Sequence, residues 1–176
     1  MAFRAGKSYD EASLYEYAIG ALGRRMRSVA ELKRLMRRRV TADEHGALLV
    51  DCVIARLKEQ KYLNDSSYAA AYISYRKENE KLGRMRVVSD LKARGVHAEV
   101  IEKAVGEAYD STSEEELARQ YLRRKRLKKP EGQKEVARVF RSLLRAGFTS
   151  RTIFKLLKNW NVDDEVLTAL ESETGS

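Results

Sequence analysis

The chain has little of the chemistry that enzymes use. Its 176 residues include one cysteine and two histidines. A single cysteine excludes an internal disulfide, and neither His45 nor His97 has a partner at metal-ligand spacing. Cys52 lies beside Val53 and Ile54, which predicts a buried, inert thiol rather than a nucleophile. We therefore expect a binding protein that is not an enzyme and that uses no cofactor or metal.

Long apolar runs are also missing. No stretch approaches the roughly 18 apolar residues that a membrane span needs, and residues 1–9 lack the apolar core of a secretory signal. We therefore expect a cytoplasmic protein without a membrane partner. Apolar residues still make up 43% of the chain, which is enough for a buried core and argues against general disorder.

Strand-like alternation of apolar and polar residues is absent over any useful length. Apolar residues recur at helical spacing instead, and a single proline interrupts the chain. Capping boxes, in which a hydroxyl and a carboxylate satisfy free amides at a helix start, mark several helix beginnings. These motifs are Ser8–Glu11, Ser28–Glu31, Thr41–Glu44 and Ser113–Glu116. The predicted fold class is all-α.

A repeated pattern organises these helices. In three places apolar residues three apart lead into a short polar turn and then one apolar anchor. The anchors Val40, Val96 and Phe148 lie 56 and 52 residues apart, and Gly95 and Gly147 precede the last two. Glycine there can end a helix in a left-handed conformation. Chance similarity among amphipathic helices is the alternative to a true repeat.

The period predicts an elongated array of three tandem three-helix repeats, each a helix-turn-helix-like unit that needs its neighbours to complete its core. We place the repeats at residues 8–62, 63–110 and 113–172, the last with an extra C-terminal helical turn.

Basic residues are in excess and are clustered. Lysine and arginine number 35 against 26 acidic residues, which gives a formal net charge of +9. Such an excess favours an anionic partner, most often nucleic acid, and the alternative is a role in solubility alone. We predict that the clustered cations face DNA or a protein–DNA assembly. They are Arg24, Arg25, Arg27, Lys33, Arg34, Arg37, Arg38, Arg84, Arg86, Lys92, Arg94, Arg123, Arg124, Lys125, Arg126, Lys128 and Lys129.

The placement of these cations supports that prediction. Arg34 and Arg38 are four residues apart and lie opposite the apolar stripe of their helix. Like charges at this spacing destabilise a helix by about 0.2–0.5 kcal/mol per pair, whereas phosphates reward them through counterion release. The alternatives are a merely solvated face and, for the cluster at 123–129, a favourable interaction with the helix dipole.

The last helix of a unit does not fit a major-groove recognition helix, because it carries acids such as Asp51 and Glu102. The basic residues lie on the preceding helices, which suits backbone contact without sequence readout.

Four segments resemble motifs of one family in both order and spacing. They are RSVAEL at 27–32, LNDSSYA at 63–69, the stretch from Gly83 to Val96, and RAGFT at 145–149. They are similar to the motifs of the RecX proteins, bacterial regulators of the RecA recombinase, and the resemblance runs from about residue 9 to residue 160. Ser66, Ser67 and Val88 depart from the usual pattern, as does the segment after Trp160.

The resemblance implies tandem three-helix repeats and binding along the RecA–DNA filament. It also implies limits on filament extension, ATP hydrolysis and strand exchange, with RecA and single- or double-stranded DNA as partners of a monomer. The family has no catalytic residue or cofactor, so the resemblance predicts none for this chain. The alternatives are a stand-alone, sequence-nonspecific nucleic-acid-binding protein, a helix-turn-helix-type regulator, and a helical scaffold for other proteins.

Overall fold

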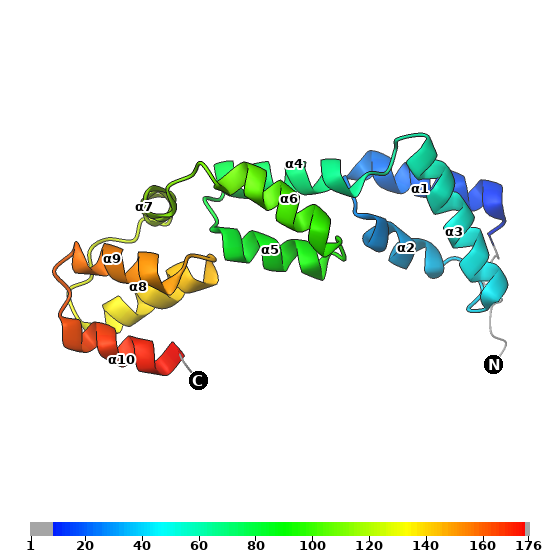
Figure 1. Cartoon of the computed structure of the whole chain (residues 1–176). Coiled ribbons are helices and arrows are strands. Elements are labelled where there is room, and N and C mark those ends of the chain that lie inside the picture. The colour runs from blue at the N-terminus through cyan, green and yellow to red at the C-terminus, as the bar shows by residue number, and fades with distance from the viewer. Residues whose placement is uncertain (1–8, 175–176) are drawn as a thin grey trace, which may run out of the picture. The chain divides into compact units, whose positions relative to one another are not determined.

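The computed structural model describes residues 9–174, and within this range every regular element is an α-helix (Figure 1). This confirms the predicted fold class. In chain order the helices are α1 (Glu11–Arg24), α2 (Val29–Arg37), α3 (Glu44–Glu59), α4 (Asp65–Glu78), α5 (Arg84–Ala93), α6 (Ala98–Tyr109), α7 (Glu114–Arg124), α8 (Gln133–Arg145), α9 (Ser150–Lys158) and α10 (Asp164–Thr174). No helix of the described range combines the length and apolar character needed to cross a bilayer.

The chain divides into two compact units. The first contains the chain up to Ala70 together with Leu91–Glu102, and the second contains Ala71–Asp90 and the chain from Lys103 onward. The divisions fall inside α4, α5 and α6, which are the helices of the predicted second repeat. The boundaries of the three repeats stay a prediction.

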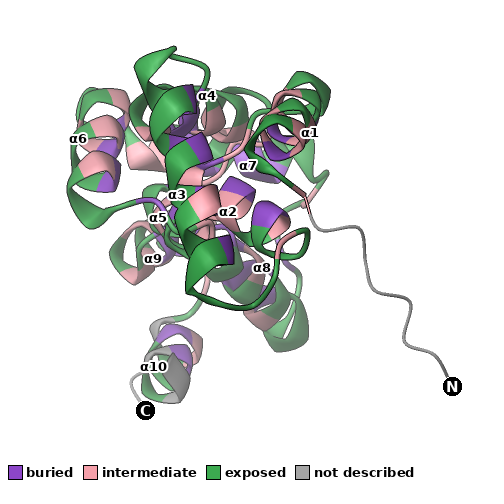
Figure 2. Ribbon diagram, turned by 90° about the vertical axis from the view of Figure 1, so that its right-hand side faces the viewer, coloured by how far each residue is buried: buried purple, intermediate pink, exposed green. Residues whose placement is uncertain are grey.

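The core of the first unit forms where the apolar stripes of α1, α2 and α3 meet. Leu14 of α1, Leu32 and Met36 of α2, and Val50 and Leu57 of α3 are all fully buried. The spacings of four residues in α2 and seven in α3 place each pair on one face of its helix. Figure 2 shows the result on α3, where buried segments in purple alternate with exposed ones in green.

The two glycine turns have the predicted left-handed backbone. Gly95 has a φ of 76° and Gly147 a φ of 88°. In each turn the glycine amide and the amide of the following anchor donate to carbonyls of the last helical turn, and Val96 donates to Leu91 over 3.2 Å. This is the Schellman arrangement, which satisfies carbonyls that a helix end leaves free. The first repeat has Arg39 in place of such a glycine, and Arg39 does not have a positive φ.

Each glycine turn receives the beginning of another helix. In the first unit the Ser28 hydroxyl, just before α2, donates to the carbonyl of Arg94 over 2.6 Å. In the second unit the amide of Gly83, just before α5, donates to the carbonyl of Ala146 over 2.8 Å. A helix start is electropositive and a helix end electronegative, so both contacts are favourable. The repeated turn is thus also a repeated docking point.

Ser28 is central to the first of these contacts. Its side chain is fully buried, accepts from the Glu31 amide over 3.1 Å and donates to Arg94. The Glu31 carboxylate accepts from the Ser28 amide over 3.2 Å, which completes the predicted capping box. Ser28 therefore satisfies groups of two separate helices.

We expect Ser28→Ala to lower the free energy of unfolding by about 1–3 kcal/mol, because the cap is lost and the carbonyl of Arg94 loses its nearest donor. Urea denaturation measures this loss. The control is Ser113→Ala, because Ser113 caps α7 at an exposed position, and its loss should cost about 1 kcal/mol or less. Equal costs for the two variants would contradict the docking role of Ser28.

Two local predictions were wrong, one is met only in part, and another lies outside the described residues. At Ser113 half of the predicted capping box forms: the hydroxyl accepts from the Glu116 amide over 3.3 Å, while the Glu116 carboxylate accepts from Gln120 and Arg123. Cys52 is exposed, because one residue before Val53 is a rotation of about 100° away from the buried face. The start of α3 is capped by Asp43, which accepts from the Gly46 amide over 2.7 Å and from the Thr41 hydroxyl over 2.8 Å. The Thr41–Glu44 capping box is therefore absent. The proposed cap at Ser8 falls outside the described range.

Candidate anion-binding surface

Five of the predicted cations line one small cavity in the first unit. The cavity has a volume of about 290 Å³. Its charged lining consists of Arg25, Arg27, Arg34, Arg38, Arg94 and Glu31, and Leu35 and Ala93 complete the wall. The arginines come from the segment between α1 and α2, from α2 itself, and from the end of α5. Folding thus joins residues that lie more than 50 positions apart in the sequence.

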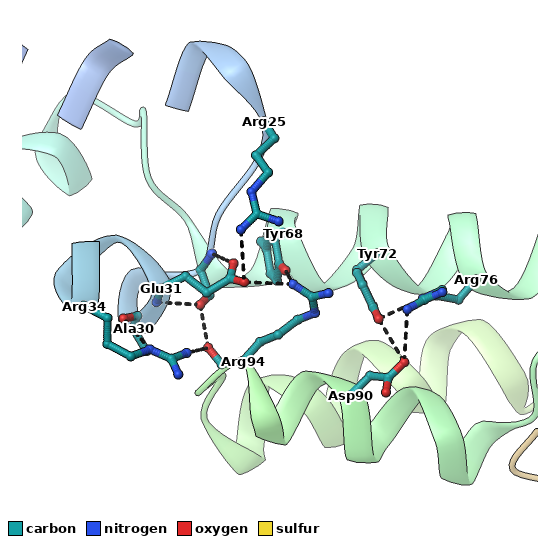
Figure 3. Close-up of polar contacts among 10 residues, drawn as sticks. Arg25, Ala30, Glu31, Arg34, Tyr68, Tyr72, Arg76, Asp90 and Arg94 are labelled. Carbon is teal, nitrogen blue, oxygen red and sulfur yellow. Dashed lines mark hydrogen bonds and ion pairs between the residues drawn. The ribbon is translucent and has the colours of Figure 1, made fainter. Parts of the chain in front are cut away.

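Glu31 lies in the inner wall of this cavity, where its carboxylate contacts two of the arginines. One of its carboxylate oxygens lies 2.8 Å from Nη1 of Arg94 and 3.8 Å from Nη2 of Arg25 (Figure 3). Arg94 also donates to the Tyr68 hydroxyl over 3.1 Å. Burial, together with the negative charge of Glu31, raises the pKa of the Tyr68 hydroxyl. Tyr68 therefore stays neutral and accepts from the guanidinium.

Arg34 and Arg38 form the outer wall. Both side chains are exposed, and Arg34 is oriented by hydrogen bonds to the carbonyls of Ala30, at 3.3 Å, and Arg94, at 3.5 Å (Figure 3). Five guanidinium groups face one carboxylate, so the lining carries four net positive charges. Arginine presents several donors in a planar fork that matches carboxylate and phosphate oxygens. The cavity can therefore bind an anionic group.

Other predicted cations are engaged with neighbouring acids instead. Lys33 pairs with Asp51 at 2.6 Å, and the hydrogen bond from Lys33 holds the pKa of that carboxyl below its usual value. In the second unit Arg84 lies 3.3 Å from Asp110, and Arg86 and Arg123 also have acidic partners. An exposed ion pair contributes little stability, but it lowers the net charge that such a cation offers to a partner.

The remaining predicted cations are exposed on the surface. They are Arg24, Arg37, Lys92, Arg124, Lys125, Arg126, Lys128 and Lys129. The last five begin at Arg124, the final residue of α7, and continue beyond the helix, where Arg126 has a positive φ of 54°. This segment is a second basic surface, separate in sequence from the arginine cavity. That these residues contact DNA or a recombinase stays a prediction.

A polar network in the second unit was not foreseen from the sequence. Tyr72 of α4 donates to the Asp90 carboxylate of α5 over 2.9 Å, and Arg76 donates to the Tyr72 hydroxyl over 2.8 Å (Figure 3). Arg76 also pairs with Glu80 at 2.6 Å, and Arg86 with Asp90 at 3.0 Å. The network ties α4 to α5, which makes it structural. Because Arg86 pairs with Asp90, it offers less positive charge to an anionic partner.

The described residues contain no group of three or more side chains arranged to hold a metal ion. What the chain does offer is a set of cationic surfaces on helices. Comparison with known proteins shows which family the chain belongs to.

A family model for the second three-helix domain of RecX matches residues 64–105, the range that contains α4 and α5 and most of α6. Regulatory protein RecX of Thermobifida fusca (strain YX) is 30% identical over 140 residues, which cover 78% of this chain and 72% of that protein. The chain belongs to the RecX family. Regulatory protein RecX of Bacillus pumilus (strain SAFR-032) is 30% identical over 168 residues, or 88% of this chain.

Some RecX proteins are longer than the region matched. The match covers 62% of the Bacillus pumilus protein and 55% of regulatory protein RecX of Geobacillus kaustophilus (strain HTA426). Two solved structures share the fold. One crystal structure of regulatory protein RecX has a TM-score of 0.64 at 22% identity, covering 85% of this chain and 71% of that one. RecX from Lactobacillus salivarius has a TM-score of 0.63 at 19% identity, covering 86% of this chain and 96% of that one.

Proposed function

We propose that this RecX chain regulates the RecA recombinase, mainly as an inhibitor. It acts as a monomer that binds along the RecA–DNA filament and limits filament extension, ATP hydrolysis and strand exchange. Membership of the RecX family supports this proposal, and the motifs at 27–32 and 83–96 contribute residues to the arginine cavity. The observation that carries it is the cavity itself, where five arginines face a single carboxylate.

The arginine cavity suits a filament because a filament repeats its anionic groups at regular intervals. One guanidinium pair binds a phosphate or a carboxylate in two parallel hydrogen bonds. A second cationic surface, the exposed segment 123–129, lies in the other compact unit. Two weak contacts on one chain raise the overall affinity because the second contact becomes intramolecular.

The proposal is tested by ATP hydrolysis. RecA is assembled on single-stranded DNA and the chain is added in increasing amounts. We expect the hydrolysis rate to fall with added protein until the filament is saturated. An unchanged rate, with binding to the filament demonstrated by co-sedimentation, would contradict inhibition of RecA.

A stand-alone nucleic-acid-binding role is the second candidate, and the exposed basic segment 123–129 favours it. A helix-turn-helix regulator is less favoured, because α3 carries the acids Glu44, Asp51 and Glu59 on exposed positions. These acids would be repelled by phosphates at a major groove. Strong binding to DNA without RecA would support the second candidate over the first, and a clear sequence preference would favour a helix-turn-helix regulator.

A further inference from the structure

The only tryptophan of the chain lines a hollow with a cationic rim. The hollow has a volume of about 390 Å³ and lies against α7 and α9. Its lining consists of Arg119, Arg123, Leu122, Leu127, Leu156, Asn159 and Trp160. Trp160 is partly exposed, Leu122 and Leu156 are buried beneath it, and both arginines are exposed. An apolar, aromatic floor is therefore bordered by two arginines, which pair with Glu115 and Glu116 of α7.

A second hollow on α9 continues this surface. It has a volume of about 570 Å³ and is lined by Ser150, Arg151, Phe154, Lys155, Lys158 and Asn159. Asn159 borders both hollows, so the two hollows adjoin, and each contains one aromatic ring, Trp160 or Phe154. Aromatic rings alternating with lysine and arginine are typical of proteins that bind single-stranded nucleic acid.

The acids of α7 hold this surface in place. Glu115 lies 2.6 Å from Nζ of Lys155, which joins α7 to α9, and that hydrogen bond holds the pKa of the Glu115 carboxyl below its usual value. Glu114 accepts from the Thr149 amide over 2.9 Å at the start of α9. Glu116 pairs with Arg123 at 2.8 Å. The geometry of the hollow is thus fixed before any ligand arrives.

Cations still outnumber these acids on the surface. Glu115 pairs with Arg119 and Lys155, and Glu116 pairs with Arg123, whereas Glu114 accepts hydrogen bonds from Thr149 and Thr152. The exposed cations of residues 124–129 extend the positive charge beyond α7. This charge excludes a cationic ligand and favours a polyanion. A polyanion with apolar, planar groups is the ligand that fits both the charge and the aromatic floor.

We propose that the hollow at Trp160 binds one base of a single-stranded nucleic acid, stacked on the indole ring, while the surrounding cations contact its phosphates. This inference rests on the proposed function and identifies where single-stranded DNA would meet the chain. A duplex keeps its bases stacked and paired, so it can offer only phosphates to this surface.

The fluorescence of Trp160 tests the proposal without any substitution, because the chain has no other tryptophan. The probes are an oligothymidylate, an abasic strand of the same length, and a duplex of matched charge. We expect strong quenching by the oligothymidylate and weak quenching by the other two. Equal quenching by all three would overturn the proposal, because it would mean that only phosphates are recognised.

Substitution of the ring gives an independent measure. Trp160→Leu should weaken binding of the oligothymidylate about fivefold to hundredfold, the range expected for one stacked base, whereas Trp160→Phe should retain most of the affinity. Binding of the abasic strand should be nearly the same for both variants and the wild type, which also shows that the variants are folded. An unchanged oligothymidylate affinity in Trp160→Leu would overturn the proposal.

The base-stacking proposal and the proposed inhibition of RecA are contradicted by different results. If Trp160→Leu keeps full affinity for the oligothymidylate but no longer inhibits RecA, the hollow binds a recombinase side chain and the base-stacking proposal is wrong. If the wild type quenches as expected but leaves ATP hydrolysis by RecA unchanged, the stacking site stands and inhibition of RecA is wrong.

Discussion

Replacing Arg34 and Arg38 by glutamate should abolish inhibition of RecA at protein concentrations where the wild type saturates. The arginine cavity would then hold three arginines and three glutamates, so its net charge would fall from four positive charges to none. A hydrogen bond to a charged group contributes about 1.5–3 kcal/mol. Loss of two such contacts weakens binding about 100-fold or more. The measurement is the RecA hydrolysis rate as a function of added protein.

The variant should remain folded. Arg34 and Arg38 are exposed, whereas the core contacts of α2 are made by Leu32 and Met36 on its other face. The change replaces one like-charge pair at a four-residue spacing by another, so the repulsion within the helix stays about the same. Far-ultraviolet circular dichroism and urea denaturation verify the fold before the inhibition assay.

The matched control is the double variant Lys58→Glu and Lys61→Glu. Both lysines are exposed at the end of α3, and the variant has the same total charge as the cavity variant. We expect it to keep most of the inhibition. If the two double variants lose inhibition equally, net charge alone is responsible and the arginine cavity has no special role. Full inhibition by the cavity variant would exclude the cavity as a contact surface.

Features governed by local sequence could be predicted. The Ser28–Glu31 capping box and the glycine turns at Gly95 and Gly147 depend on residues within one turn of a helix, and all three are present. The stripe containing Leu32 and Met36 is likewise buried. Local hydrogen bonding and the helical period set these features, so a single sequence is sufficient to find them.

Features that depend on tertiary contacts could not be predicted. The cations Arg34 and Arg94 lie 60 residues apart in the sequence, and they share a cavity because Ser28 docks on the carbonyl of Arg94. The pairing of Arg86 with Asp90 depends on the network that joins α4 to α5. The partly exposed ring of Trp160 is a consequence of how α7 and α9 pack. The only signal in the sequence was an aromatic residue near lysines of α9.

The second large effect, a loss of stability, is expected from substitution in a glycine turn. Gly147→Ala should lower the free energy of unfolding by about 3 kcal/mol or more. Its φ of 88° strains any residue with a Cβ, and an added Cβ would lie 2.2 Å from the backbone nitrogen of Arg86. Helix α5 would have to move away from the turn, and the hydrogen bond from Gly83 to Ala146 would be lost with it. Urea denaturation followed by circular dichroism measures the loss.

Substitutions at two other glycines distinguish backbone strain from steric contact as causes of this loss of stability. Gly132→Ala should change stability by less than about 1 kcal/mol, because Gly132 has extended backbone and no atom within 4 Å of an added Cβ. Gly95→Ala combines a φ of 76° with a contact of 2.5 Å to the Cβ of Ala30. Adding Ala30→Gly removes that contact, so part of the stability lost in Gly95→Ala should return.

No such rescue is available at Gly147, because its obstacles include the backbone nitrogen and Cα of Arg86. Removing the Arg86 side chain therefore should not restore the stability of Gly147→Ala. If Arg86→Gly did restore it, the turn would be limited by side-chain crowding. The close approach of two helix backbones would then no longer explain why a glycine ends α8.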